Sequence, residues 1–247
     1  YVIPFIISSV FLLVALVMLL VKIRENAILK EVQKEMELGE QYSLTEDVIT
    51  ENKPLSKSDK RNLIILLISV FLWFASFNAV ETFLSVYAEN VLNNSAIAGT
   101  AVIILTVSSI ITFVPAGLVT SRFGRKNVVL FGLITILLAL ILLILIREFN
   151  IWMMLSFSLA GIGWASINVN SYPMLVEMTH KGNIGKYTGL YYTFSMLAQS
   201  FTPIIAGAIM TFLLGPDPLF YYSAVLMAAA LLVFMLFKEN KLAVKKQ

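Results

Sequence analysis

The sequence predicts an all-α membrane protein with seven transmembrane helices. Seven apolar stretches each come close to the ~20 residues that a helix needs to cross about 30 Å of hydrocarbon. Hydrophobic residues make up 59% of the 247-residue chain and charged residues only 13%, a balance that excludes a soluble domain of this length. The stretches are 2–21, 62–88, 96–119, 128–146, 151–175, 187–212 and 219–237.

The positive charges orient these stretches in the bilayer. Threading them alternately places 22–61, 120–127, 176–186 and 238–247 on one side. Those segments carry 17 of the 18 Lys and Arg residues, and only Arg147 lies opposite. Because cytoplasmic loops are enriched in Lys and Arg, that side and the carboxyl terminus are predicted to be cytoplasmic. The net charge of +3 reflects this bias and does not indicate a nucleic-acid partner. We expect a multi-pass protein of the plasma membrane.

The first stretch is expected to be the last helix of a preceding transmembrane half. Residues 1–21 begin without an initiator Met and end before Lys22 and Arg24, so the amino end is predicted to face outward. A bundle with an even number of helices and both ends in the cytoplasm keeps an outward amino end and an inward carboxyl end when it loses an odd number of helices from its start. A cleaved signal peptide before Tyr1 is the alternative.

Segment 22–61 is predicted to be the central cytoplasmic loop, since it holds 8 basic and 9 acidic residues. In its first part, Ile23, Ala27, Val32 and Met36 recur at near-helical spacing. A helix along the membrane surface is therefore the alternative to an ordinary charged linker. The outer loops are too short for a ligand-capturing domain, so function is predicted to lie within the membrane.

The last six stretches alternate between polar and apolar with a period of three. The first two of each triplet carry several hydroxyls and amides, whereas 128–146 and 219–237 are almost wholly apolar. This period predicts a 3+3 repeat in which two helices of each triplet line a wet cavity and the third faces lipid. We expect 62–238 to form a six-helix transmembrane half, followed by a cytoplasmic tail at 239–247.

Glu81 is the only ionisable side chain well inside a stretch. It lies about 20 residues beyond Arg61, at ~1.5 Å per residue, which places it in the outer half of the membrane. Asn78, Glu81 and Ser85 share one helix face. Burying a charge at mid-membrane costs about 2.5–3.5 kcal/mol, so such residues mark function. Glu81 is predicted to bind a proton or to accept hydrogen bonds from a polyol. The alternative is an interfacial Glu that extends outward to water.

Two further stripes combine aromatic rings with amides. Trp164 and Asn168 recur at helical spacing in the fifth stretch, as do Tyr192 and Gln199 in the sixth. A sugar site needs this combination, because a ring covers the apolar face of a pyranose while amides pair with its hydroxyls. Contact between helices is the alternative role. The candidate solute- and cation-binding residues are Asn78, Glu81, Trp164, Asn168, Tyr192 and Gln199.

Catalytic and metal chemistry find no support in the sequence. The chain has no Cys, and its one histidine, His180, lacks the companions of a metal site and is expected on the surface. No GxSxG or HExxH motif and no paired Asp within a stretch indicate an intramembrane hydrolase. We expect neither enzymatic activity nor a bound cofactor.

The turn between the third and fourth stretches carries a recognisable motif. It reads GLVTSRFGRK over residues 117–126 and resembles the signature loop of the major facilitator superfamily. In that pattern the first Gly lets two helices meet closely, the second permits a tight turn, and the Arg residues bind carboxylates and helix ends. Ser121 stands where the acidic residue usually does. The matching residues are Gly117, Arg122, Gly124, Arg125 and Lys126.

This resemblance implies two six-helix halves joined by a long cytoplasmic loop. The chain would supply the last helix of the first half, the central loop and the complete second half. Residues 170–190 further resemble sucrose-type and related glycoside cation symporters. Glu177 lies on a cytoplasmic turn next to the signature loop and is the expected partner of Arg122 or Arg125 in a cytoplasmic gate.

The predicted function is secondary active transport by alternating access, as proton-coupled symport of a sugar or another small polar solute. The expected partners are the solute, protons, the lipid bilayer and the missing amino-terminal half. A multidrug or metabolite exporter of the same superfamily is the alternative. A seven-helix receptor is the alternative from another class, but the last stretch has no Lys to hold retinal.

Overall fold

The computed structural model describes residues 9–14, 16–18, 55–179 and 184–238. The chain divides into two units, 1–53 and 54–247. In the first unit, residues 9–14 and 16–18 are helical. The remainder of the first predicted stretch, most of the central loop with its possible surface helix, His180 and the tail at 239–247 lie outside the described residues.

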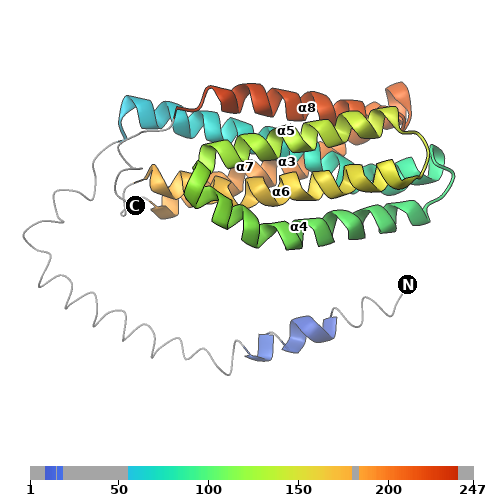
Figure 1. The fold of residues 1–247 in the computed structure, drawn as a ribbon, viewed down its shortest axis with the longest axis horizontal. Coiled ribbons are helices and arrows are strands. Elements are labelled where there is room, and N and C mark those ends of the chain that lie inside the picture. Colours follow the sequence, from blue (N-terminus) through green and yellow to red (C-terminus); the bar gives the residue numbers. More distant parts are fainter. Residues whose placement is uncertain (1–8, 15, 19–54, 180–183, 239–247) are drawn as a thin grey trace, which may run out of the picture. The chain divides into compact units, whose positions relative to one another are not determined.

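The second unit is a bundle of six helices (Figure 1). Each of the last six predicted stretches corresponds to one helix, and the described residues contain no strand. Five helices are long and apolar enough to cross a membrane, and the sixth, α8, is shorter and equally apolar. The predicted all-α membrane fold is therefore confirmed. The helices are α3 (Lys57–Asn90), α4 (Ala96–Phe123), α5 (Arg125–Leu145), α6 (Ile151–Glu177), α7 (Ile184–Ile209), continued by the π-helical turn η2 (Met210–Leu214), and α8 (Leu219–Met235).

Helix α3 begins before its apolar stretch because polar residues cap it. The Ser56 hydroxyl accepts a hydrogen bond from the Asp59 backbone N–H at 3.1 Å and donates to the Asp59 carboxylate at 2.6 Å. Such a cap satisfies a free N–H of the first turn. The start of α3 is also bonded to the segment that follows α8: the Asn62 side chain donates to the Lys238 carbonyl at 2.6 Å and accepts from the Lys238 N–H at 3.2 Å.

The turn between α4 and α5 depends on Gly124. This residue has φ 82° and ψ 151°, and it both ends α4 and precedes α5. Positive φ is open to glycine at no steric cost, whereas other residues are strained there. The prediction that the second glycine of the signature loop permits a tight turn agrees with this geometry.

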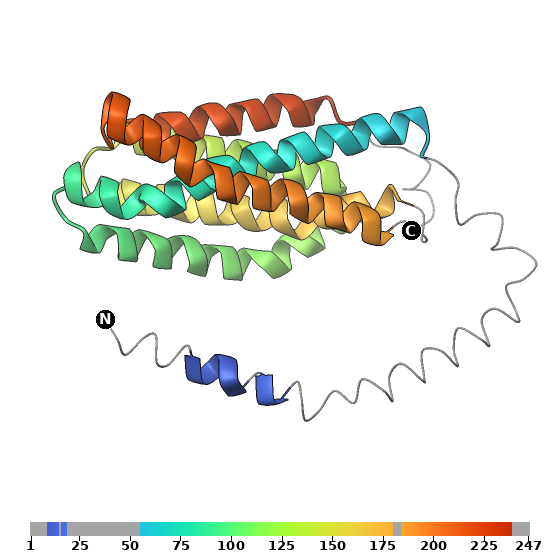
Figure 2. The same cartoon turned by 180° about the vertical axis from the view of Figure 1, so that it is seen from behind.

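The packing has the symmetry that a 3+3 repeat requires. Helix α6 packs on α4 and α5, α3 packs on α7 and α8, and α5 packs on α8. If α3, α4 and α5 are exchanged with α6, α7 and α8 in that order, the α4–α6 contact becomes the α3–α7 contact and the α5–α6 contact becomes the α3–α8 contact. The α5–α8 contact is unchanged by the exchange. Figure 2 shows α7, in orange, crossing α3.

Exposure differs between the helices of each triplet. Helix α4 is the least buried and α7 the next, whereas α5 is half-buried because it packs on both α6 and α8. The exposed side of α5 is an apolar stripe at helical spacing, as expected of a helix that faces lipid. Its members are Phe131, Ile134, Leu138, Ile141, Leu142 and Leu145.

Helix α6 approaches its two neighbours at glycines. A Cβ added to Gly161 would lie 2.3 Å from the Leu105 carbonyl oxygen of α4. A Cβ on Gly163 would lie 2.6 Å from the carbonyl oxygen of Gly132 on α5, and one on Gly132 would lie 2.7 Å from that of Gly163. Small residues at helix crossings are typical of membrane proteins. At Gly117, where the signature motif predicts close approach, the same Cβ would make only an ordinary contact, 3.9 Å from Val169. Gly117 lies on an exposed side of α4, so it makes no close helix contact among the described residues.

Candidate functional site

A pocket of about 250 Å³ lies between α3, α4 and α6. Helix α3 contributes one side, α4 the opposite side and α6 a single tryptophan. The lining is largely apolar, with Glu81 as its only ionisable group. The lining residues are Phe77, Val80, Glu81, Leu84, Val102, Leu105, Thr106, Ser109, Ile110, Phe113 and Trp164.

Glu81 enters this pocket from the outer half of α3, consistent with its predicted depth. Its side chain is exposed within the six-helix unit. Among the described residues the one ion pair joins Arg125 and Glu177, so no Lys or Arg of this part of the chain neutralises Glu81. Phe77 lies one helical turn before Glu81 and lines the same pocket.

Trp164 forms the aromatic wall of the pocket together with α3. Its ring stacks on Phe77 with centroids 3.8 Å apart and an interplanar angle of 8°, and it meets Phe74 edge-on at 5.3 Å. One face of the indole is therefore covered by Phe77. A solute can use the rest of the ring, but not both faces.

The two predicted amides beside these residues are engaged by their own helices. Asn78 donates from its amide nitrogen to the Phe74 carbonyl at 2.8 Å, and Asn168 donates to the Trp164 carbonyl at 2.9 Å. Both side chains are half-buried, and neither lines the pocket. Each retains its amide oxygen as an acceptor, so their capacity to donate to a solute is smaller than the sequence suggests.

The two candidates on α7 lie apart from the pocket. Gln199 is exposed, and Tyr192 is 49% exposed. The Tyr192 ring contacts those of Tyr172 and Tyr191, with centroids 6.2 and 5.6 Å away. The structure thus brings Glu81 and Trp164 into one pocket and leaves Tyr192 and Gln199 outside it, exposed on α7.

Two polar contacts in the carboxyl-terminal half of α6 were not predicted from the sequence. The Ser171 and Tyr191 hydroxyls lie 2.8 Å apart, and those of Tyr172 and Thr188 lie 3.1 Å apart. These bonds join α6 to α7. Because the partners lie on different helices, no spacing within either stretch indicates them.

A buried hydrogen bond joins α4 to α6 near the signature loop. The Thr120 hydroxyl lies 2.7 Å from the Asn170 amide oxygen, and the Asn170 side chain is fully buried. Further from the signature loop, the Ser109 hydroxyl, which lines the pocket, lies 3.0 Å from the Gly161 carbonyl oxygen. These two bonds hold α4 against α6.

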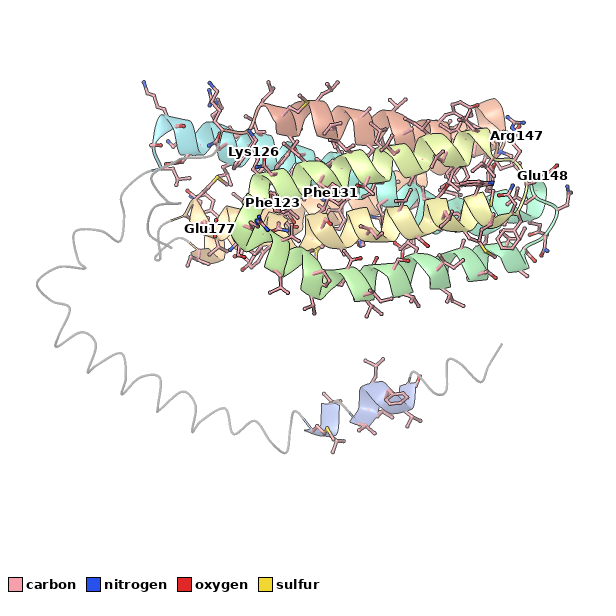
Figure 3. All side chains as sticks on the ribbon, in the orientation of Figure 1. Phe123, Lys126, Phe131, Arg147, Glu148 and Glu177 are labelled. Carbon is pink, nitrogen blue, oxygen red and sulfur yellow. The ribbon has the colours of Figure 1, made fainter. Side chains whose placement is uncertain are left out.

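The signature loop makes the predicted ion pair through Arg125. Arg125 Nε donates to Glu177 Oε1 at 2.6 Å, with the two side chains 29% and 45% exposed. Arg122, the other predicted partner, instead lies 5.7 Å from the centroid of the Phe123 ring. Figure 3 shows Lys126, Phe123 and Glu177 at one end of the bundle and Arg147 and Glu148 at the other. Ser121 donates to the Leu118 carbonyl of its own helix at 2.7 Å.

Comparisons with known proteins agree with this architecture. The family model described as Major Facilitator Superfamily matches residues 92–247, more than half of the chain. The crystal structure of the POT family transporter PepTSo is similar in fold, with a TM-score of 0.65 and 16% sequence identity. That similarity covers 71% of this chain and 37% of PepTSo, so the matched part spans well under half the length of that transporter. No curated protein matches the sequence.

Two features of the structure agree with the family match over residues 92–247: the Gly124 turn of the signature loop, which lies within the matched region, and the exchange symmetry of the six helices. The chain is an integral, multi-pass membrane protein and belongs to the Major Facilitator Superfamily.

Proposed function

We propose that the chain is part of a secondary active transporter that works by alternating access, with Glu81 as the group that carries the coupling proton. The observation that supports this most directly is the position of Glu81. It is the only ionisable side chain in a membrane-depth pocket, and the described residues offer it no counter-charge. Intramembrane carboxylates in such positions commonly serve as proton relays.

One carboxylate is sufficient for useful accumulation. A proton that crosses the membrane gains about 2.3 kcal/mol for each 100 mV of membrane potential. This energy corresponds to roughly a fifty-fold solute gradient. Glu81 would bind the proton on one side and release it on the other.

A second transmembrane half is part of this proposal. Helices α4 and α7 are the least buried of the unit, as expected if they meet an amino-terminal half across the transport path. The Lys and Arg distribution supports a cytoplasmic location for the end that carries Arg125 and Glu177, in the plasma membrane. We propose that this ion pair holds α5 to α6 as a gate on the cytoplasmic side.

The proposed solute is a sugar or another small polar molecule. The exposed part of the Trp164 ring supports this, since a ring edge and face can cover the apolar side of a pyranose. A second candidate, export of lipophilic compounds, is favoured by the pocket lining. Only Glu81, Thr106, Ser109 and the indole N–H of Trp164 contribute polar groups there.

Transport in proteoliposomes tests the role of Glu81. The full-length protein would first be screened for thermal stabilisation by sugars, nucleosides and lipophilic compounds, since a ligand that binds the folded state raises its stability. Uptake of a stabilising compound would then be driven by a pH gradient. Glu81→Gln should abolish the response to the gradient, whereas Glu89→Gln, on the exposed end of the same helix, should retain it. If the Glu81→Gln protein still accumulates solute against its gradient, Glu81 is not the coupling group.

A further inference from the structure

The walls of the Glu81 pocket are aromatic and aliphatic. Phe77, Phe113 and Trp164 contribute three rings, and aliphatic side chains from α3 and α4 supply most of the remaining surface. Two hydroxyl groups, those of Thr106 and Ser109, complete the lining. The Ser109 side chain is 5% exposed, and its hydroxyl lies 2.9 Å from the Leu105 carbonyl and 3.0 Å from that of Gly161. It is therefore engaged between helices and contributes little to a ligand.

Among the small polar solutes proposed above, this lining favours one that carries a positive charge over a sugar with several hydroxyl groups. A polyol that enters the pocket must find a partner for each hydroxyl, and each unsatisfied one costs about 1–3 kcal/mol. The pocket offers the Glu81 carboxylate, the Thr106 hydroxyl and the indole N–H of Trp164, fewer groups than the hydroxyls of a sugar need. An ammonium group needs one counter-charge, and its apolar substituents match the remaining walls. Aromatic rings also attract a cation within about 6 Å of the ring centroid.

The charge balance of the pocket points the same way. Glu81 is exposed within the six-helix unit, and a carboxylate at membrane depth is costly unless a partner of opposite charge or water accompanies it. No Lys, Arg or His of the described part of the chain lies within ion-pair distance of Glu81. A bound cation would supply the missing charge.

We infer that the pocket between α3, α4 and α6 binds a small organic cation, an amine or quaternary ammonium with apolar substituents, whose charged centre lies at Glu81 among the rings of Phe77, Phe113 and Trp164. The volume of about 250 Å³ is below the ~300–1,000 Å³ typical of small-molecule sites, so the pocket holds a small cation or the charged end of a larger one. The inference rests on the proposed function in one respect, that this pocket lies on the transport path.

Binding of benzyltrimethylammonium to the purified full-length protein tests the inference. This probe carries a fixed charge that cannot donate hydrogen bonds, so it reports on charge and ring contacts alone. Radiolabelled probe would be measured by equilibrium dialysis at low salt, because salt screens an exposed carboxylate. Unlabelled neopentylbenzene, in which carbon replaces the charged nitrogen, would serve as the neutral competitor of the same shape.

We expect the wild-type protein to bind the cation at least about tenfold more tightly than the neutral competitor. Glu81→Gln should weaken cation binding by at least about tenfold, and Trp164→Leu should weaken it by several-fold. Glu89→Gln should bind as the wild type does, since Glu89 lies on the same helix and outside the pocket.

The inference is overturned if the wild type does not bind the cation, if the neutral competitor binds equally well, or if Glu81→Gln binds as the wild type does. Should Glu81→Gln fail to fold, the comparison of cation and neutral competitor on the wild type decides the matter. Failure of the proposed function is distinguishable. If Glu81→Gln loses proton-driven uptake but binds the cation unchanged, the proposed function stands and the inference is rejected. If Glu81→Gln loses cation binding but retains proton-driven uptake, the inference stands and the proposed function is rejected.

Discussion

Replacing Gly161 by alanine tests the close approach of α4 and α6 beside the pocket. The added Cβ would lie 2.3 Å from the Leu105 carbonyl oxygen and 3.0 Å from Ser108 Cβ, whereas ordinary contact begins at 3.4 Å. The first contact is to backbone, which no side-chain rotation can relieve. The two helices must therefore separate by about 1 Å at this crossing.

The cost of that separation has two parts. Overpacking a well-packed contact costs about 1–3 kcal/mol. Separation also lengthens the 3.0 Å contact between the Ser109 hydroxyl and the Gly161 carbonyl, and an interhelical hydrogen bond in a membrane protein contributes about 0.6 kcal/mol on average. Alanine regains up to about 1 kcal/mol of helix propensity. Gly99→Ala, on α4, isolates this gain because nothing lies within 4 Å of its added Cβ.

Relative to Gly99→Ala, we expect Gly161→Ala to lower the free energy of unfolding by about 1.5–3.5 kcal/mol. The lower free energy of unfolding should appear as a lower unfolding midpoint. Thermal unfolding of the full-length protein, followed by tryptophan fluorescence, measures the difference. Equal midpoints for the two variants would show that the crossing separates without cost, and the reasoning from Cβ distances would be wrong.

Three further predictions concern bonds between helices. Thr120→Val removes the hydroxyl 2.7 Å from Asn170 and should lower the free energy of unfolding by about 0.5–2 kcal/mol. Thr193→Val, whose exposed hydroxyl binds only its own helix, is its control, and equal midpoints would contradict the prediction. Asn62→Ala removes both bonds to Lys238, so the Lys238 amide should exchange its hydrogen faster, while Asn90→Ala leaves that rate unchanged. Arg125→Glu and Glu177→Arg should each impair transport and together restore it, with stability altered by less than about 1 kcal/mol because the pair is partly exposed. A double variant no better than either single one would exclude the gate.

The six-helix unit was largely predictable because the length of a transmembrane helix is set locally. The apolar stretches fix where α4 and α6 begin, and the three-stretch period indicates the 3+3 arrangement. Helix ends were less predictable, since α3 extends to Lys57 through a cap that hydropathy does not register. The crossing glycines were also not predictable, because whether Gly117 or Gly161 meets a neighbour depends on how each helix is rotated.

The candidate site was predicted in part, for a related reason. Helical spacing predicts a polar face for Asn78 and Glu81, whereas the structure joins Glu81 to Trp164 through one pocket and leaves Asn78 outside it. Spacing cannot indicate that Phe77 covers one face of Trp164, since that contact joins two helices. Spacing also does not indicate that the Asn78 and Asn168 side chains donate to backbone carbonyls one turn earlier. Any amide side chain in a helix can form such a bond, so the sequence alone does not show which ones do.

The glycine crossings of α6 have a consequence for how the bundle can rearrange. Backbone touches backbone where α6 meets α4 and α5, so sliding there forces carbonyl groups past one another. Toward α3, by contrast, α6 presents the flat Trp164 ring against Phe77, and stacked rings glide with little resistance. Motion should therefore concentrate along the α3–α6 seam, while α6 keeps its contacts with α4 and α5 at the glycine crossings, and the mouth of the pocket opens or narrows as that seam shears.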